Sequence, residues 1–299
     1  MELYKSGTLP PEILQEVRKL HFYTNRLADE GVIGQYRSAF RGRGVEFEEV
    51  RNYYPGDDIR CIDWKVTARS GAPFVKLFRE ERELTVMLAV DVSRSTFTGS
   101  KAQLRAKSMA QIGALLTLIA LRNNDKVGLV TFSDKLETFH PPRKARSAVW
   151  RILHEVLNPN AEGHKTDLAG FCNFLIKTLR RPAIVFLISD FICPPCEREL
   201  AMLAQKHDLT AVYVTDPLDN ELPKLGLLSL SNPETNQTVT IDSSDPIVSE
   251  VYKKHFADHR QTMERLFNKH GIGIIELETN RPLLAPVQQY FQKRRLMRY

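Results

Sequence analysis

The chain has 299 residues, of which 42% are hydrophobic and 26% are charged, so it can bury a substantial core in one large or two smaller domains. Its 42 basic and 36 acidic residues leave a formal net charge of +6, which permits an acidic partner but does not indicate nucleic-acid binding. The longest apolar-rich run, Met109–Leu121, is too short for a membrane span, and the sequence shows neither a signal region nor a disulfide framework, so we expect a cytoplasmic protein.

Two segments precede the first buried strand. A double proline followed by apolar residues at helical spacing predicts a helix over Pro11–Ile33. From Tyr36 to Arg82, glycines, a Pro-Gly-Asp-Asp turn and aromatic residues among charges predict short strands joined by turns. Nine basic and nine acidic residues interleave between Arg41 and Glu83, which suits a self-neutralising surface, whereas the Arg, Tyr and Trp content also suits a protein interface. We expect Arg41–Arg82 to pack beside the following domain and to contribute to a partner surface.

From Leu84 onward, short apolar strands alternate with amphipathic helices. The predicted strands are Leu84–Asp91, Lys126–Phe132, Leu136–His140, Ala183–Ser189, Leu209–Thr215 and Gly271–Leu277. The predicted helices are Lys101–Arg122, Arg146–Leu157, Leu168–Leu179, Glu197–Lys206 and Pro246–Lys269. This alternation predicts an α/β fold with a doubly wound, mostly parallel sheet, because each crossover helix returns the chain parallel to itself.

Three details refine this arrangement. The strand Leu136–His140 should be antiparallel, because its three-residue connection is too short for a crossover helix, and the pair Pro141-Pro142 should end it. A small hairpin is expected at Leu227–Leu230 and Thr238–Ile241. We therefore expect an N-terminal helix with a β-rich extension over residues 1–83, the sheet domain over residues 84–280, and a solvated basic tail over residues 281–299.

One stretch carries a candidate site. The first buried strand stops at Asp91, and Ser93 and Ser95 follow it. Open α/β sheets bind ligands at the carboxyl ends of their strands, and three oxygen ligands from one loop suit a hard cation such as Mg2+. The same residues could instead turn the chain and cap the next helix, and this stretch alone leaves both interpretations open. A later strand also stops at an acid, Asp190, which should lie at the same edge of the sheet.

The Asp-x-Ser-x-Ser pattern, with a distant Asp190, resembles the metal-ion-dependent adhesion site of von Willebrand factor type A domains. The segment GHKTDL, from Gly163 to Leu168, resembles the part of that family that supplies a threonine. The resemblance implies that the chain holds Mg2+, or alternatively Mn2+ or Ca2+, through five ligands: Asp91, Ser93, Ser95, Thr166 and Asp190. Two positions depart from the family pattern: Thr96 replaces a frequent methionine, and Phe191 replaces a frequent glycine. Neither change removes an oxygen ligand, although Phe191 could alter how a partner approaches the ion.

The segment before the sheet domain narrows the resemblance. The strings RGRGVEF from Arg41, RNYYPGDDIR from Arg51, IDW from Ile62 and Ala68-Arg69 resemble the signature of the domain-of-unknown-function 58 family, in which they precede a type A domain. The resemblance implies a short form without a membrane anchor that works with a MoxR-type AAA+ ATPase in chaperone-like maturation or remodelling of client proteins. It also implies a non-enzymatic role, in which an acidic residue of a partner binds the ion.

Two alternatives stay open in the sequence. Asp91 and Asp190 could serve a metal-dependent hydrolase such as a phosphoesterase, but no acid follows Asp91 closely, as it does in aspartyl phosphatases. The chain has no G-x-x-x-x-G-K-[ST] loop, so any ATPase activity should belong to a partner. Cys193 and Cys196 could form a redox pair near the site, or they could be two reduced cysteines at a proline-rich helix start.

Overall fold

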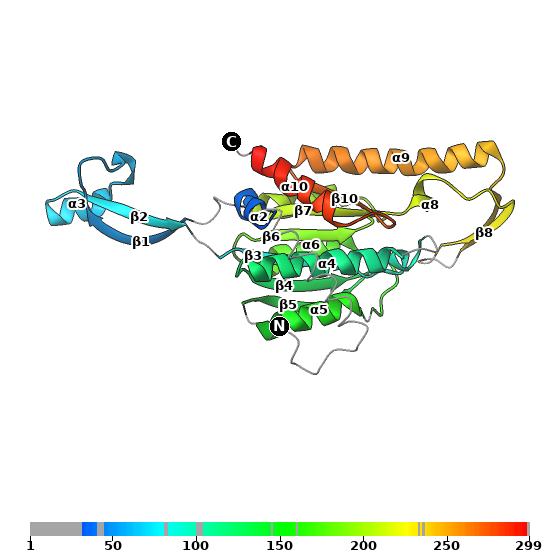
Figure 1. Cartoon of the computed structure of the whole chain (residues 1–299), viewed down its shortest axis with the longest axis horizontal. Helices are drawn as coiled ribbons and strands as arrows, with labels where there is room; N and C mark the ends of the chain where they lie inside the picture. Colours follow the sequence, from blue (N-terminus) through cyan, green and yellow to red (C-terminus); the bar gives the residue numbers. More distant parts are fainter. Residues whose placement is uncertain are drawn as a thin grey trace.

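The computed structural model describes residues 32–40, 45–80, 83–99, 104–144, 146–159, 161–232, 234 and 237–297. Its body is a six-stranded sheet in the order β10-β7-β6-β3-β4-β5, with helices on both faces (Figure 1). The strands are β3 (Thr85–Asp91), β4 (Lys126–Phe132), β5 (Leu136–Arg143), β6 (Ile184–Ser189), β7 (Asp208–Thr215) and β10 (Gly273–Glu278). All neighbours pair in parallel except β4 and β5. The predicted α/β fold with a doubly wound, mostly parallel sheet is therefore confirmed.

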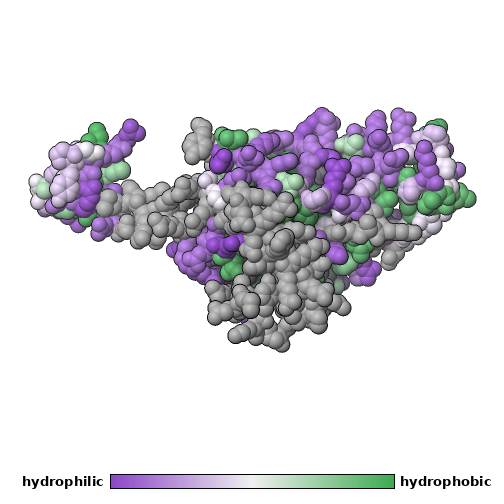
Figure 2. All heavy atoms as spheres, viewed as in Figure 1, coloured by the Kyte–Doolittle hydropathy of each residue, from purple (hydrophilic) through white to green (hydrophobic). Residues whose placement is uncertain are grey.

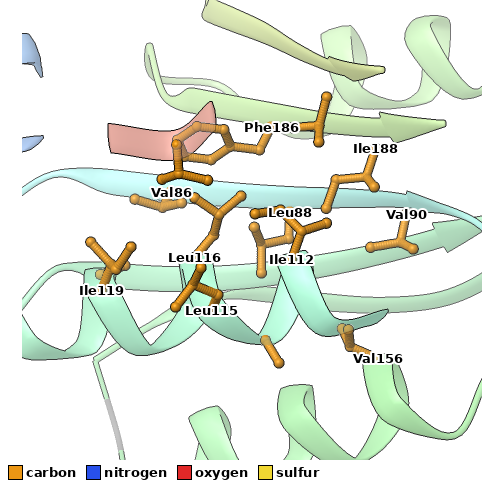
Figure 3. Packing of buried hydrophobic residues seen from close by; sticks show 14 of the residues in the cluster. Val86, Leu88, Val90, Ile112, Leu115, Leu116, Ile119, Val156, Phe186 and Ile188 are labelled. Carbon is orange, nitrogen blue, oxygen red and sulfur yellow. The ribbon is translucent and has the colours of Figure 1, made fainter. Parts of the chain in front are cut away.

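The central strand β3 is covered on both faces because its side chains alternate between two hydrophobic cores. Val86, Leu88 and Val90 point toward α4, as Figure 3 shows, whereas Met87 and Ala89 belong to the opposite core. The first core includes residues of α2 (Val32–Phe40), α4 (Arg105–Arg122), α5 (Arg146–Leu157) and α10 (Leu284–Leu296). The second includes residues of α6 (Leu168–Thr178), α7 (Glu197–Lys206) and α9 (Pro246–Lys269). Burial on both faces explains why this strand reads as a continuous apolar run.

The edge strand β5 is longer than the sequence predicts. It continues through Pro141 and Pro142 to Arg143, so the prediction that the proline pair ends it was wrong. An edge strand tolerates proline because the missing N–H groups can face away from the sheet. Gly128 on β4 also permits the close approach, since a Cβ there would lie 2.8 Å from the carbonyl oxygen of His140.

The two terminal helices of the described chain pack together on the first core. Tyr36 and Phe40 of α2 contact the ring of Phe291 in α10, and all three side chains are buried. The guanidinium of Arg294 lies 4.5 Å from the ring centre of Phe40 and donates to the carboxylate of Asp208. The prediction of a solvated basic tail was therefore wrong. The segment contains basic residues, but an apolar face of its helix packs into the core.

The described part of the N-terminal region forms a separate hairpin. Short strands were predicted here, and β1 (Val45–Asn52) and β2 (Phe74–Glu80) pair antiparallel. A 3-10 turn (Ile59–Cys61) and α3 (Trp64–Ser70) lie between them. The short helix was not predicted, although Asp63 caps its start and Gly71 ends it in a left-handed conformation.

This hairpin extends away from the sheet on the left of Figure 1, whereas β8 lies at the opposite end. The expectation that Arg41–Arg82 packs beside the sheet domain was therefore wrong for its described residues, 45–80. The predicted helix Pro11–Ile33 lies outside the described residues except for its last two positions, which belong to α2.

The remaining elements follow β7. They are α8 (Pro217–Asn220) and the hairpin of β8 (Leu227–Ser231) and β9 (Thr238–Asp242), which was predicted. Within the described ranges, no helix combines the length and the hydropathy that crossing a bilayer requires.

The ion pair between Arg294 and Asp208 provides a test of the last helix. Arg294→Ala removes the cation that faces a buried carboxylate, so we expect the free energy of unfolding to fall by about 3 kcal/mol. Lys293→Ala, on the exposed side of the same helix, should change it by less than about 0.5 kcal/mol. Urea denaturation measures both, and equal effects of the two substitutions would contradict the packing of α10.

His207 should make stability depend on pH. Its side chain is fully buried, the N–H of Ala183 donates to Nδ1, and burial lowers its pKa to about 4. The unfolded chain takes up a proton near pH 6.5 while the folded chain resists it, so stability falls as the pH drops from about 6.5 toward 4. Between pH 7.5 and 5 we expect a loss of about 2 kcal/mol from this group in urea denaturation. His207→Asn, which keeps an acceptor but does not titrate, should show a correspondingly smaller loss.

Candidate metal centre

The two acids of the candidate site lie at the carboxyl ends of neighbouring strands. β3 and β6 pair in parallel, so Asp91 at the end of β3 and Asp190 directly after β6 reach the same edge of the sheet. Both carboxylates are only 1% exposed. The three hydroxyl residues that the sequence predicts as ligands, Ser93, Ser95 and Thr166, are buried as well.

The loop after β3 brings the first three predicted ligands together. The N–H of Ser93 donates to Oδ1 of Asp91 at 2.9 Å, and the hydroxyl oxygens of Ser93 and Ser95 lie 3.0 Å apart. The carbonyl of Ser93 accepts from the hydroxyl of Thr96 at 2.7 Å, which closes a 3-10 turn over Arg94–Phe97. Thr96, at the position where the related pattern often has methionine, therefore holds the turn that orients both serines.

The loop that carries Thr166 is fixed beside this turn by backbone contacts. The N–H of Arg94 donates to the carbonyl of His164 at 3.2 Å, which joins the two loops. Gly163 lies so close to the turn after β4 that a Cβ would overlap the hydroxyl of Ser133. Glu137 of β5 accepts from the N–H of Gly163 at 2.7 Å. A glycine suits this position because a Cβ would collide with the side chains of Ser133 and Asp134.

The backbone conformation at residue 191 favours glycine, which the related pattern often has at this position. Phe191 has a φ of 55°, in the left-handed region where side chains are disfavoured. Its ring is fully buried and packs edge-on against Tyr213 and Phe267. The expectation that Phe191 could alter the approach of a partner is therefore wrong, since the side chain points into the core and away from the site.

Burial disfavours the charged forms of both acids of the site. Burial raises the pKa of Asp91, and the negative charge of Asp190 raises it further. Burial also raises the pKa of Asp190, against the opposing charge of Arg105. Two buried carboxylates that repel each other would be stabilised by a cation between them.

A buried carboxylate oxygen without a hydrogen-bond partner bears on whether these residues fit a metal ion. Oδ2 of Asp190 is buried and has no hydrogen-bond partner among the described residues. The nearest cationic atom that faces it, Nη1 of Arg105, is 3.8 Å away, beyond hydrogen-bonding distance. This orphaned oxygen, a second carboxylate and three buried hydroxyls form an all-oxygen set that fits a hard divalent cation. Within the described ranges, no group of three or more His, Cys, Asp or Glu side chains is placed for metal binding.

Two contacts of the site were missed in the sequence analysis. The hydroxyl of Ser189 donates to Oδ2 of Asp91 at 2.7 Å and accepts from the N–H of Phe191. Its position next to Asp190 at a strand end could have indicated this role. Arg105 at the start of α4 is buried and pairs with Asp219 as well as facing Asp190. No local sequence signal identifies Arg105, because both acids lie far from it in the chain.

The cysteines near the site are both free thiols. Cys196 directly precedes α7, and a hydrogen bond between the two thiols lowers the pKa of Cys196 and raises that of Cys193. A redox role for the pair stays a prediction.

A family model described as "Protein of unknown function DUF58" matches residues 49–262. The chain belongs to this family. Over 288 residues it is 30% identical to the uncharacterized protein Rv1480 of Mycobacterium tuberculosis, a match that covers 95% of this chain and 90% of the relative. It is also 32% identical over 160 residues to the uncharacterized protein MAV169 of Mycobacterium avium, covering 52% of this chain and 93% of the relative.

Two solved structures share a more distant likeness with this DUF58 protein. The conserved hypothetical protein BatB from Bacteroides thetaiotaomicron aligns with a TM-score of 0.44 and 14% identity, covering 71% of this chain and 98% of the other. The SpRpn10 VWA domain aligns with a TM-score of 0.38 and 11% identity, covering 69% and 93%. At this low sequence identity, the two solved structures give no information about the function of this chain.

Arg105 should contribute strongly to the free energy of unfolding when no metal ion is present. Arg105→Gln leaves Asp190 and Asp219 buried without the cation between them, so we expect the free energy of unfolding to fall by about 3–5 kcal/mol in EDTA. Lys107→Gln, an exposed position on the same helix, should have an effect below about 0.5 kcal/mol. Urea denaturation distinguishes the two, and a small effect of Arg105→Gln would show that its charge is not needed there.

Proposed function

We propose that this protein is a non-enzymatic, Mg2+-dependent adaptor that binds other proteins through the ion. The ligands would be Asp91, Ser93, Ser95, Thr166 and Asp190, with Mn2+ or Ca2+ as alternative ions. The observation that carries the proposal is the buried, unpartnered Oδ2 of Asp190 beside a second buried carboxylate. When bound, the ion would neutralise both acids and offer an open coordination position to a carboxylate of a partner.

The surface around the site supports an acidic partner. Arg94, His164 and Lys165 are exposed at its rim. A pocket of about 470 Å³ opens beside the ligands and is lined by Val92, Arg94, Phe97, Thr98, Ala161, Gly163 and His164. The positive charges of Arg94 and Lys165 around a recessed ion would attract an acidic side chain and disfavour basic surfaces. Phe97, which is 47% exposed at the pocket, adds an apolar contact of the kind found in protein interfaces.

The contacts of Asp91 support binding over hydrolysis. Its carboxylate accepts hydrogen bonds from the N–H of Ser93 and from the hydroxyl of Ser189. Both groups fix its orientation, and neither is a general acid or base of the kind that a phosphoesterase requires. The resemblance to the domain-of-unknown-function 58 family further supports a MoxR-type AAA+ ATPase as partner, acting with this chain on client proteins.

Removal of the ion or of Asp91 should abolish partner binding while the fold survives. Purified protein should bind Mg2+ in isothermal titration calorimetry, and it should bind a purified MoxR-type ATPase from the same source only when Mg2+ is present. Asp91→Ala should abolish partner binding and weaken Mg2+ binding at least about tenfold, because a charged ligand is lost. Circular dichroism would verify that the variant is folded.

Asp258→Asn is the control, since Asp258 is an exposed acid on α9. It should leave both interactions unchanged. Partner binding that persists in EDTA, or in the folded Asp91→Ala protein, would overturn the proposal, as would phosphatase or nuclease turnover that depends on Asp91.

A further inference from the structure

The tip of the β8–β9 hairpin places an acid at the candidate metal centre. The strands β8 and β9 pair from Leu227–Asp242 to Ser231–Thr238, and the N–H of Asn232 donates to the carbonyl of Gln237 beyond them. Within this loop, Oε1 of Glu234 accepts a hydrogen bond from the hydroxyl of Thr166 at 3.4 Å. Thr166 is one of the five predicted ligands, so a carboxylate of the chain itself already contacts the site.

Glu234 is held in this place by local structure and lies within the electrostatic field of the site. Its N–H donates to Oδ1 of Asn232 at 2.9 Å, which shapes the turn. The side chain is half-buried, and burial followed by the negative charge of Asp190 raises the pKa of Glu234. A carboxylate brought this close to Asp190 is unfavourable by itself. It becomes favourable once a cation lies between the two acids.

The hairpin itself is weakly held, so the contact can be reversed at little cost. Leu227 and Val239 are 77% and 59% exposed, and Figure 2 shows hydrophobic residues gathered on the surface at this end of the molecule. The base of the hairpin is joined to the start of the next segment by the bonds of Gly226 with Ser243 and Ser244. A two-stranded hairpin without a packed face is only marginally stable. Its tip can therefore leave the site while its base stays anchored.

We infer that Glu234 is a tethered carboxylate ligand of the metal centre, which occupies the ion's open position until the acid of a partner displaces it. This inference rests on the proposed function. Glu234, on the hairpin of residues 227–242, would compete with the partner's acid for the ion. A partner therefore binds only if its acid and the surrounding contacts bind more tightly than Glu234 does. The pocket lined by Arg94 and Phe97 lies beside the site and would supply such contacts to a partner.

The experiment compares Mn2+ binding and hairpin protection in the full chain. Glu234→Gln keeps the size and polarity of the side chain but removes its charge, and Glu221→Gln changes an exposed acid before the hairpin as a control. In wild type and in Glu221→Gln, saturating Mn2+ should slow hydrogen exchange of the amides in residues 227–242. In Glu234→Gln, the affinity for Mn2+ in isothermal titration calorimetry should fall about tenfold, because a charged ligand is lost, and Mn2+ should no longer protect the hairpin.

The outcomes separate this inference from the proposed function. If Glu234→Gln binds Mn2+ as wild type does and hairpin exchange is the same in both, the tethered ligand is wrong while the metal centre stands. If the folded wild-type chain binds no Mn2+, both fail. Asp91→Ala should lose Mn2+ binding and hairpin protection together, which links the two readouts to one ion.

Discussion

The parallel pairing of β3 and β6 is the constraint on which the rest of this structure depends. It brings two acids that are 99 positions apart in the chain, Asp91 and Asp190, to one edge of the sheet and buries both. Burying a carboxylate is costly unless a cation or several donors accompany it. The backbone of Ser93, the hydroxyl of Ser189 and the guanidinium of Arg105 meet part of this need. Oδ2 of Asp190, which Nη1 of Arg105 approaches only to 3.8 Å, has no hydrogen-bond partner among the described residues, and the proposed metal site rests on this oxygen.

Hydrogen bonds hold the loops at this edge of the sheet in place. Thr96 closes the turn that carries the serines, and Glu137 with Ser133 holds the backbone around Gly163, which positions Thr166. Phe191 accepts an unfavourable backbone conformation and gains a buried aromatic contact with Tyr213 and Phe267. A site prepared in this way loses little conformational freedom when it binds an ion, which favours affinity.

Two candidate binding surfaces lie at opposite ends of the molecule. The β1–β2 hairpin projects from one end, and the candidate metal centre with the β8–β9 hairpin lies toward the other (Figure 1). On the projecting hairpin, Tyr54 and Trp64 are exposed while Arg51 and Asp57 fix the turn between them. If the proposed function holds, two separated surfaces would let the chain bind an ATPase and a client protein at the same time.

The sequence by itself determined the alternation of strands and helices and the position of the two acids at strand ends, because these follow from local periodicity. The five residues of the candidate site are a prediction that a family resemblance implies. The sequence did not reveal that the tail from Leu284 is a core helix, that Arg105 faces Asp190, or that Glu234 reaches Thr166. Those contacts join segments that are 68 to 255 positions apart. Their partners are chosen by three-dimensional packing and charge balance, which only the tertiary structure decides.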